Sequence, residues 1–148
     1  LLSEYSSQKN IDILKVIKMV LIHDLVEIDA GDTFCYDEKG YEDKAEREQK
    51  AADRIFNILP PDQAEEIMGL WHEFENMETA EARFTACMDR LEPILLNYNT
   101  KGHTWQKPGV TSAKVYKRIA ILEKNAPELW EFARQLIEDS IKKGYLKP

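Results

Sequence analysis

The sequence has little of several features that mark particular classes of protein. Proline and glycine number only six each among 148 residues. Low-complexity stretches and internal repeats are absent, which argues against a disordered chain or a solenoid. The longest apolar run, residues 19–22, is far too short to cross a bilayer. No signal peptide is visible either, so we expect a cytoplasmic protein without a membrane partner.

Cysteine and concentrated positive charge are also scarce. Cys35 and Cys87 are far apart and form no C-x-x-C pair, so we expect free thiols in a reducing compartment. The formal net charge is −7 and no run is rich in lysine or arginine. Because nucleic-acid polymers are bound by a concentrated positive field, no such partner is expected. A small phosphate-bearing molecule is still possible, since a bound metal can reverse the local potential.

Helical periodicity is what the sequence has in abundance. Apolar residues make up 43% of the chain, enough at this length for one domain with a core. The β-branched residues of the first apolar segment would also allow a strand, but its length and two lysines favour a helix. The expected fold is all-α, a single compact bundle of about six helices in one domain over residues 1–148. The expected helices span residues 11–26, 41–59, 62–76, 79–98, 111–124 and 127–143.

Capping and charge patterns support these helices. Asp62 can cap the third helix, Thr111 or Ser112 can cap the fifth, and Pro127 suits the first turn of the last. Residues 42–50 are densely charged, with opposite signs four residues apart. That pattern predicts a solvated helix face.

A cluster of polar residues follows the first apolar helix. His23, Asp24, Glu27, Asp29 and Asp32 lie within ten residues. Unpaired charges are costly to bury, and a cation is the simplest partner for such a group. Imidazole and carboxylate together suit Zn, Mn, Co or Fe. If the helix persists, Glu27 projects over the same face as His23 and Asp24. On spacing alone, His23 could equally be an ordinary hydrogen-bonded core histidine.

The segment from His23 to Asp32 has the form HD-x-x-E-x-x-x-G-D, which is considerably more specific than HD alone. It resembles the HD-domain superfamily of metal-dependent phosphohydrolases. More narrowly, it is similar to the 5′-deoxynucleotidase branch, the group like HD domain-containing protein 2. The resemblance continues through residues 43–46, 84–91 and 95–99 and covers nearly the whole chain.

The resemblance implies a role for each of five residues. His23 and Asp24 match the metal-binding doublet, and Asp89 matches a distant aspartate ligand. Glu27 matches the glutamate that helps activate the attacking water. Asp32 matches an aspartate associated with the substrate sugar and the wall of the site. Without the resemblance, Asp89 would be interpreted as a solvent-facing or arginine-paired residue.

The resemblance also implies a cofactor, a reaction and a partner. The cofactor would be one divalent transition-metal ion, such as Mn, Co, Zn or Fe. The reaction would be hydrolysis of a deoxyribonucleoside 5′-monophosphate to nucleoside and phosphate, so the small-molecule partner is a nucleotide. The family also suggests a homodimer.

One expected metal ligand has no counterpart in the sequence. The family's first histidine precedes the doublet, whereas His72 and His103 follow it. We expect His72 in packing or at the surface and His103 in a loop. The chain opens without methionine, and Leu1, Leu2 and Tyr5 fall on one helical face. We therefore expect the HD domain here to lack its first helix and first ligand histidine.

Two alternatives remain open at this point. The first is an HD phosphohydrolase that acts on another nucleotide: a triphosphate, a cyclic nucleotide or an alarmone. The second is a non-catalytic helical module that only binds a nucleotide. Glu27 distinguishes them, because a pure binding module has no need of a water-activating carboxylate.

Overall fold

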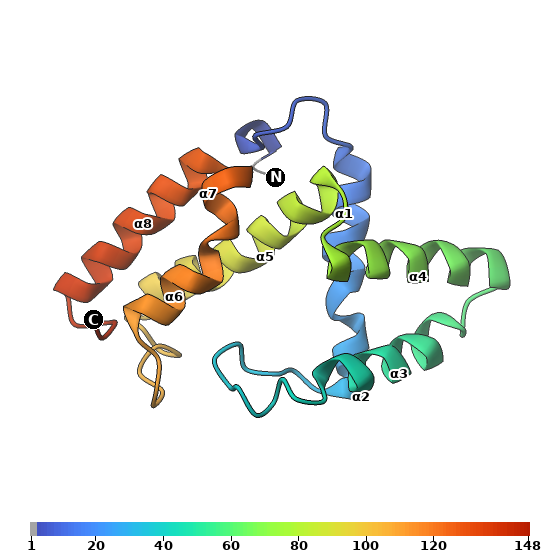
Figure 1. Cartoon of the computed structure of the whole chain (residues 1–148), viewed down its shortest axis with the longest axis horizontal. Coiled ribbons are helices and arrows are strands. Elements are labelled where there is room, and N and C mark those ends of the chain that lie inside the picture. The colour runs from blue at the N-terminus through green and yellow to red at the C-terminus, as the bar shows by residue number, and fades with distance from the viewer. Residues whose placement is uncertain (1–2) are drawn as a thin grey trace. The chain divides into compact units, whose positions relative to one another are not determined.

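The computed structural model describes residues 3–148 (Figure 1). The described residues form helices joined by turns and loops, without any strand among them. Six of these helices have eight residues or more, so the all-α prediction with about six helices is confirmed. The helical face expected at the start of the chain includes Leu1 and Leu2, which lie outside the described residues.

The chain divides into two compact units. One comprises Asp12–Ala82, called the doublet unit here because it contains His23 and Asp24. The other comprises Arg83–Pro148 with the described part of Leu1–Ile11, and is called the C-terminal unit. Each unit has its own buried core. The expectation of one domain over residues 1–148 stays a prediction.

The doublet unit begins with α1 (Ile13–Ile22). Asp12 caps this helix by accepting a hydrogen bond from the backbone N–H of Lys15, at 3.1 Å. A 3-10 turn, η2 (His23–Val26), and a one-turn helix, α2 (Glu27–Ala30), follow. The buried residues of α1 recur at helical spacing and are Val16, Met19 and Ile22.

The helix predicted over residues 11–26 therefore keeps its α form only as far as Ile22. Helix ends commonly tighten into 3-10 geometry, because their last carbonyls have no intrahelical donor. Here the ring of His23 contacts one of these carbonyls, that of Val20, at 2.9 Å. The doublet consequently sits on the 3-10 turn and not within a continuous α-helix.

Two longer helices complete the doublet unit. The first, α3 (Lys44–Phe56), follows a loop over residues 31–43. The second, α4 (Pro61–Asn76), has Pro60 at its cap position and Pro61 at its first residue. The predicted capping role of Asp62 is wrong, because Asp62 lies in the first turn. Proline fits at this point because the first helical N–H needs no partner within the helix.

Two ion pairs join α1 to α4. Lys15 Nζ lies 2.6 Å from Glu73, and Lys18 Nζ lies 2.5 Å from Glu66. These partners explain why a mostly apolar helix carries two lysines: both side chains extend along one flank toward the acidic face of α4.

The C-terminal unit is built on α5 (Ala80–Asn99), whose first turn belongs to the doublet unit. Thr79 accepts a hydrogen bond from the N–H of Ala82 at 3.1 Å, as expected for a helix start. Trp105 is only 1% exposed in the connection after α5. The side-chain oxygen of Asn97 accepts the N–H groups of Thr104 and Trp105, so this connection is more ordered than a simple polar loop.

Three further helices follow in the C-terminal unit. The helix predicted over residues 111–124 divides at Ala120 into α6 (Ser112–Ile119) and α7 (Ile121–Asn125). Thr111 caps α6, as predicted. The last helix, α8 (Pro127–Lys142), starts at the predicted proline. Among residues 3–148, none of the helices combines the length and apolar character needed to cross a membrane.

Candidate metal centre

His23 is held in one orientation and one tautomer. Its ring packs edge-on against Phe74 of α4, with centroids 4.8 Å apart, and its side chain is 11% exposed. The Nδ1 atom lies 2.9 Å from the carbonyl oxygen of Val20. Because a carbonyl can only accept, Nδ1 carries a proton, so a neutral ring here has its lone pair on Nε2. That is the tautomer in which a histidine binds a metal through Nε2.

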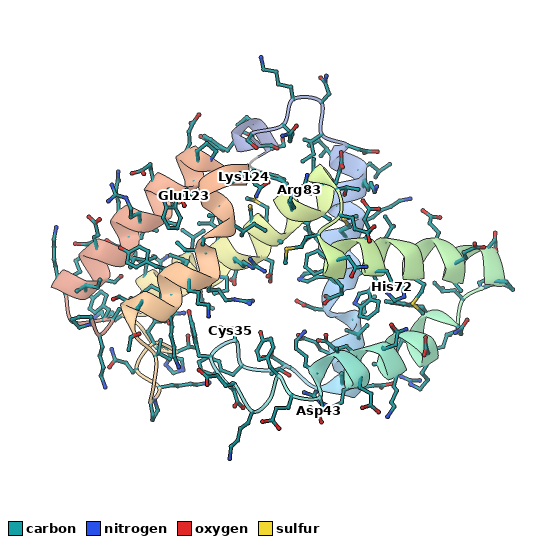
Figure 2. The ribbon with its side chains drawn as sticks, viewed as in Figure 1. Cys35, Asp43, His72, Arg83, Glu123 and Lys124 are labelled. Atoms are coloured by element: carbon teal, nitrogen blue, oxygen red, sulfur yellow. The ribbon has the colours of Figure 1, made fainter. Side chains whose placement is uncertain are left out.

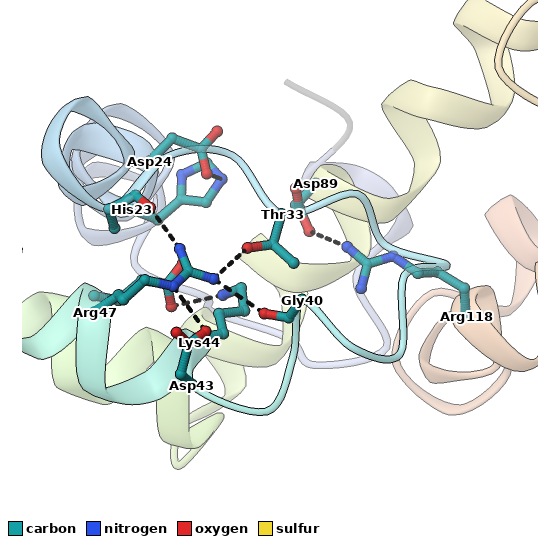
Figure 3. A network of polar contacts seen from close by, with 11 residues as sticks. His23, Asp24, Thr33, Gly40, Asp43, Lys44, Arg47, Asp89 and Arg118 are labelled. Atoms are coloured by element: carbon teal, nitrogen blue, oxygen red, sulfur yellow. Dashed lines mark hydrogen bonds and ion pairs between the residues drawn. The ribbon is translucent and has the colours of Figure 1, made fainter.

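Asp24 completes the doublet on the exposed side of the turn. Its Oδ1 atom lies 3.1 Å from Nε2 of His23, and its side chain is 65% exposed (Figure 3). Two acceptors this close repel each other unless a proton or cation neutralises them. Neighbouring ligands of an octahedral ion with bonds of about 2.1 Å lie about 3.0 Å apart. The observed separation and the imidazole–carboxylate pair therefore fit a divalent transition-metal ion.

Glu27 shares a face with Asp24. In a 3-10 turn, residues three apart eclipse each other, so Asp24 and Glu27 line up, whereas His23 is rotated away. The alignment of all three side chains was predicted on the condition that the α-helix persists, and α1 ends at Ile22. The pKa of Glu27 is raised to about 7, chiefly by partial burial and also by the charges of Asp24, Asp32 and Glu48. A carboxyl group that titrates near neutral pH is suited to accept a proton.

The raised pKa of Glu27 predicts a pH-dependent stability. The folded chain binds this proton more tightly than the unfolded chain, so stability falls as pH rises from about 4.5 to about 7. In EDTA at pH 8, Glu27→Gln should increase the free energy of unfolding by about 1 kcal/mol, a value already reduced for solvent screening of the partly exposed carboxylate. That gain corresponds to a rise in melting temperature of about 2–4 °C. At pH 5 most of this gain should vanish. An equal gain at both pH values in thermal unfolding would show that the Glu27 proton is not its cause.

Asp32 belongs to the same acidic cluster. It is exposed and follows Gly31, whose φ of +78° suits glycine. Its charge raises the pKa of Glu27, as do those of Asp24 and Glu48. The positive charge of Lys44 offsets part of this effect.

A partly buried ion pair lies beside this cluster. Glu48 is 5% exposed, and its Oε2 atom lies 2.6 Å from Nζ of Lys44. Burial lowers the pKa of Lys44, but the hydrogen bond to Glu48 and the charges of Glu48 and Glu75 raise it more, so the net shift is upward. The prediction of a wholly solvated face over residues 42–50 is wrong at Glu48. The four-residue spacing indicated the pair but not its burial.

Asp89 lies on α5, in the C-terminal unit. Its Oδ2 atom is 3.7 Å from Nη2 of Arg118 on α6, so it faces an arginine (Figure 3). Within residues 3–148, no three histidine, cysteine, aspartate or glutamate side chains are grouped to hold a metal ion. The metal-ligand roles of His23, Asp24 and Asp89 therefore stay predictions, as do the roles of Glu27 and Asp32.

The other two histidines lie on α4 and in the connection after α5. His72 lies on α4 beside Trp71, with ring centroids 4.9 Å apart (Figure 2). His103 is exposed in the connection after α5. Both positions agree with the packing and loop roles expected for them. Cys35 and Cys87 are free thiols.

Comparisons with known proteins agree on one protein family. The model of the HD domain family matches residues 1–130. A crystal structure described as a predicted metal-dependent phosphohydrolase, from Magnetospirillum magnetotacticum, is 50% identical with a TM-score of 0.91. The similarity covers 99% of this chain and 75% of that one.

The curated relatives are named as 5′-deoxynucleotidases. The 5′-deoxynucleotidase HDDC2 of Dictyostelium discoideum is 40% identical over 90 residues, which are 61% of this chain and 47% of that protein. The human 5′-deoxynucleotidase HDDC2 is 36% identical over 81 residues, 55% of this chain and 40% of that protein. The chain thus spans less than half the length of these curated relatives. Because the family model covers most of its residues, including His23 and Asp89, the chain belongs to the HD domain family.

Proposed function

We propose that this chain is part of a metal-dependent phosphohydrolase, and most specifically of a 5′-deoxynucleotidase. The reaction is hydrolysis of a deoxyribonucleoside 5′-monophosphate to nucleoside and phosphate. The observation that carries the proposal is the His23–Asp24 pair, with Nε2 and Oδ1 3.1 Å apart beside the carboxyl group of Glu27. Membership of the HD domain family and the names of the curated relatives support it.

The proposed cofactor is one divalent transition-metal ion held by His23 and Asp24, with Asp89 as a further ligand. Such an ion lowers the pKa of water and polarises a phosphoryl oxygen. The hydrogen bond from Nδ1 to Val20 and the contact with Phe74 keep the imidazole of His23 oriented for this role. In the family a histidine upstream of the doublet is a fourth ligand. No histidine precedes His23 in residues 1–148, so these residues offer three of the four proposed ligands.

Glu27 is the proposed general base. Its carboxylate takes a proton from the attacking water, whose oxygen forms a bond to phosphorus as the bond to the 5′ oxygen of the nucleoside breaks. The leaving oxygen takes up a proton, so the products are the nucleoside and inorganic phosphate. Asp32 is proposed to contact the sugar of the substrate. The complete protein is proposed to act in the cytoplasm as a homodimer.

A phosphate-release screen of the full-length protein tests the proposal. Nucleoside mono-, di- and triphosphates and cyclic nucleotides are each supplied with Mn, Co, Zn or Mg. We expect phosphate from deoxyribonucleoside 5′-monophosphates with a transition-metal ion, and at least 100-fold less in excess EDTA, because both water activation and phosphate polarisation need the ion. Release from triphosphates or cyclic nucleotides alone would contradict the nucleotidase. Binding of nucleotides without any turnover would indicate a binding module.

A further inference from the structure

The loop that carries Asp32 is gripped by one arginine. This Asp32 loop (residues 31–43) contains no helix. Arg47, one turn into α3, donates from Nη1 to the carbonyl oxygen of Ala30 at 2.5 Å, and from Nη2 to Oγ1 of Thr33 at 3.1 Å (Figure 3). Ala30 and Thr33 flank the Gly-Asp pair, so the guanidinium group bonds the chain on both sides of Asp32.

The far end of the loop is held by the same group. Nη2 of Arg47 also donates to the carbonyl oxygen of Gly40, at 3.0 Å. A β-carbon at Gly40 would lie 2.9 Å from Cγ2 of Thr33. The beginning and the end of the loop therefore lie close together at the point where Arg47 donates hydrogen bonds to both. Nε of Arg47 is 2.9 Å from Oδ1 of Asp43, and this fourth bond fixes the direction of the fork.

Only the shape of arginine explains this set of contacts. Guanidinium is a rigid planar fork with donors on three nitrogens, whereas the ammonium of lysine is a single compact charge. The carbonyl of Ala30 is one of those that a helix end leaves without an intrahelical donor. The N–H of Gly31 bonds the carbonyl of Glu27 at 2.9 Å. The contact with Ala30 therefore links Arg47 to the turn that begins at Glu27.

We propose that Arg47 is a positioning residue for substrate binding. Its guanidinium group fixes the Asp32 loop against α2 and α3, and so holds the carboxylate of Asp32 where it meets the nucleotide. This inference rests on the proposed function for the role of Asp32, and on hydrogen bonds within the doublet unit for the role of Arg47.

Hydrogen–deuterium exchange of the metal-free protein tests whether Arg47 holds the Asp32 loop, and it requires no measurement of enzyme activity. Arg47→Lys keeps the charge and loses the fork, so amides of residues 31–43 should exchange about tenfold faster than in the unsubstituted protein. Arg54→Lys is the matched control. Arg54 lies on the same helix and pairs with Asp29 of α2, with Nη2 2.8 Å from Oδ1. Arg54→Lys should leave exchange in the Asp32 loop unchanged. Equal exchange rates in the two variants would show that Arg47 does not hold this loop.

Kinetics test the consequence for the substrate. With a deoxyribonucleoside 5′-monophosphate, Arg47→Lys should raise KM about tenfold and change kcat less than about threefold, since ground-state binding is lost. Thr33→Val removes one acceptor and should act in the same direction by about threefold. If Arg47 acts through Asp32, adding Arg47→Lys to Asp32→Asn should cost little more.

The outcomes separate the two ideas. Independent, multiplying effects of Arg47→Lys and Asp32→Asn on KM would overturn the positioning role, as would a fall in kcat alone. If the unsubstituted full-length protein hydrolyses no nucleotide, the proposed function fails, while the exchange experiment still decides whether Arg47 holds the loop. If nucleotides are hydrolysed and loop exchange does not depend on Arg47, only the positioning role fails.

Discussion

Glu27→Gln should lower the rate of phosphate release from deoxyribonucleoside 5′-monophosphates by about 10²- to 10⁴-fold. The amide keeps the size of the side chain and its place at the start of α2 but cannot take a proton from water. Because the site loses one negative charge and no proposed metal ligand, metal affinity should fall by less than about tenfold. Both quantities are measured on the full-length protein, by steady-state kinetics and by metal titration.

The ionisation of Glu27 should also determine how the rate of phosphate release depends on pH. The base must be ionised to act, so the rate should rise with pH as Glu27 loses its proton. Without a metal its pKa is raised to about 7 by burial and by Asp24, Asp32 and Glu48. A cation held by the doublet adds positive charge nearby, which lowers this pKa. The rising limb of the pH profile of the metal-loaded enzyme should therefore lie below pH 7, and it should be absent in Glu27→Gln.

Glu46→Gln is the matched control for loss of one glutamate charge. Glu46 is exposed on α3, and its Oε1 atom lies 2.6 Å from Nζ of Lys50. Its substitution should leave the rate within about twofold, because exposed ion pairs contribute little. A Glu27→Gln enzyme that retained the full rate would exclude Glu27 as the base. Equal losses of rate in the two variants would indicate that the overall negative charge of the protein affects the rate, and not proton transfer to Glu27.

Much of the local structure could be predicted from the sequence, because its causes are local. Apolar residues at helical spacing placed α1, α3, α4 and α5 within a few residues of their observed bounds. Thr111 and Pro127 marked helix starts because capping and proline geometry depend on the adjacent backbone. The doublet was recognisable from its motif.

The features that escaped prediction depend on contacts between distant segments or on how a helix ends. Nothing in the sequence indicates that α1 ends at Ile22, so the placement of His23 and Asp24 on a 3-10 turn and of Glu27 at the start of α2 came only from the structure. The charge pattern of α3 predicted a solvated face because alternating signs do not reveal what packs on them. Glu48 is buried there, and Arg47 reaches back to Ala30 across 17 positions of sequence.

The second large effect is expected at the doublet itself. Asp24→Asn should weaken binding of a divalent transition-metal ion at least 100-fold, since losing even an outer partner of a metal ligand costs about 10- to 100-fold. Asp24 suits this test because its side chain is 65% exposed, so the variant should fold. Its charge raises the pKa of Glu27, and removing that repulsion should leave the metal-free protein at least as stable.

Thermal unfolding with and without metal separates ligand loss from misfolding. At a metal concentration about 100 times Kd, binding stabilises the folded state by about 2.7 kcal/mol, which is a rise in Tm of about 5–10 °C for a protein of this size. Asp24→Asn should lack this rise and keep its metal-free Tm. His103→Ala, in an exposed connection, should keep the full rise. A normal metal-induced rise in Asp24→Asn would place the metal elsewhere and remove the basis of the proposed mechanism.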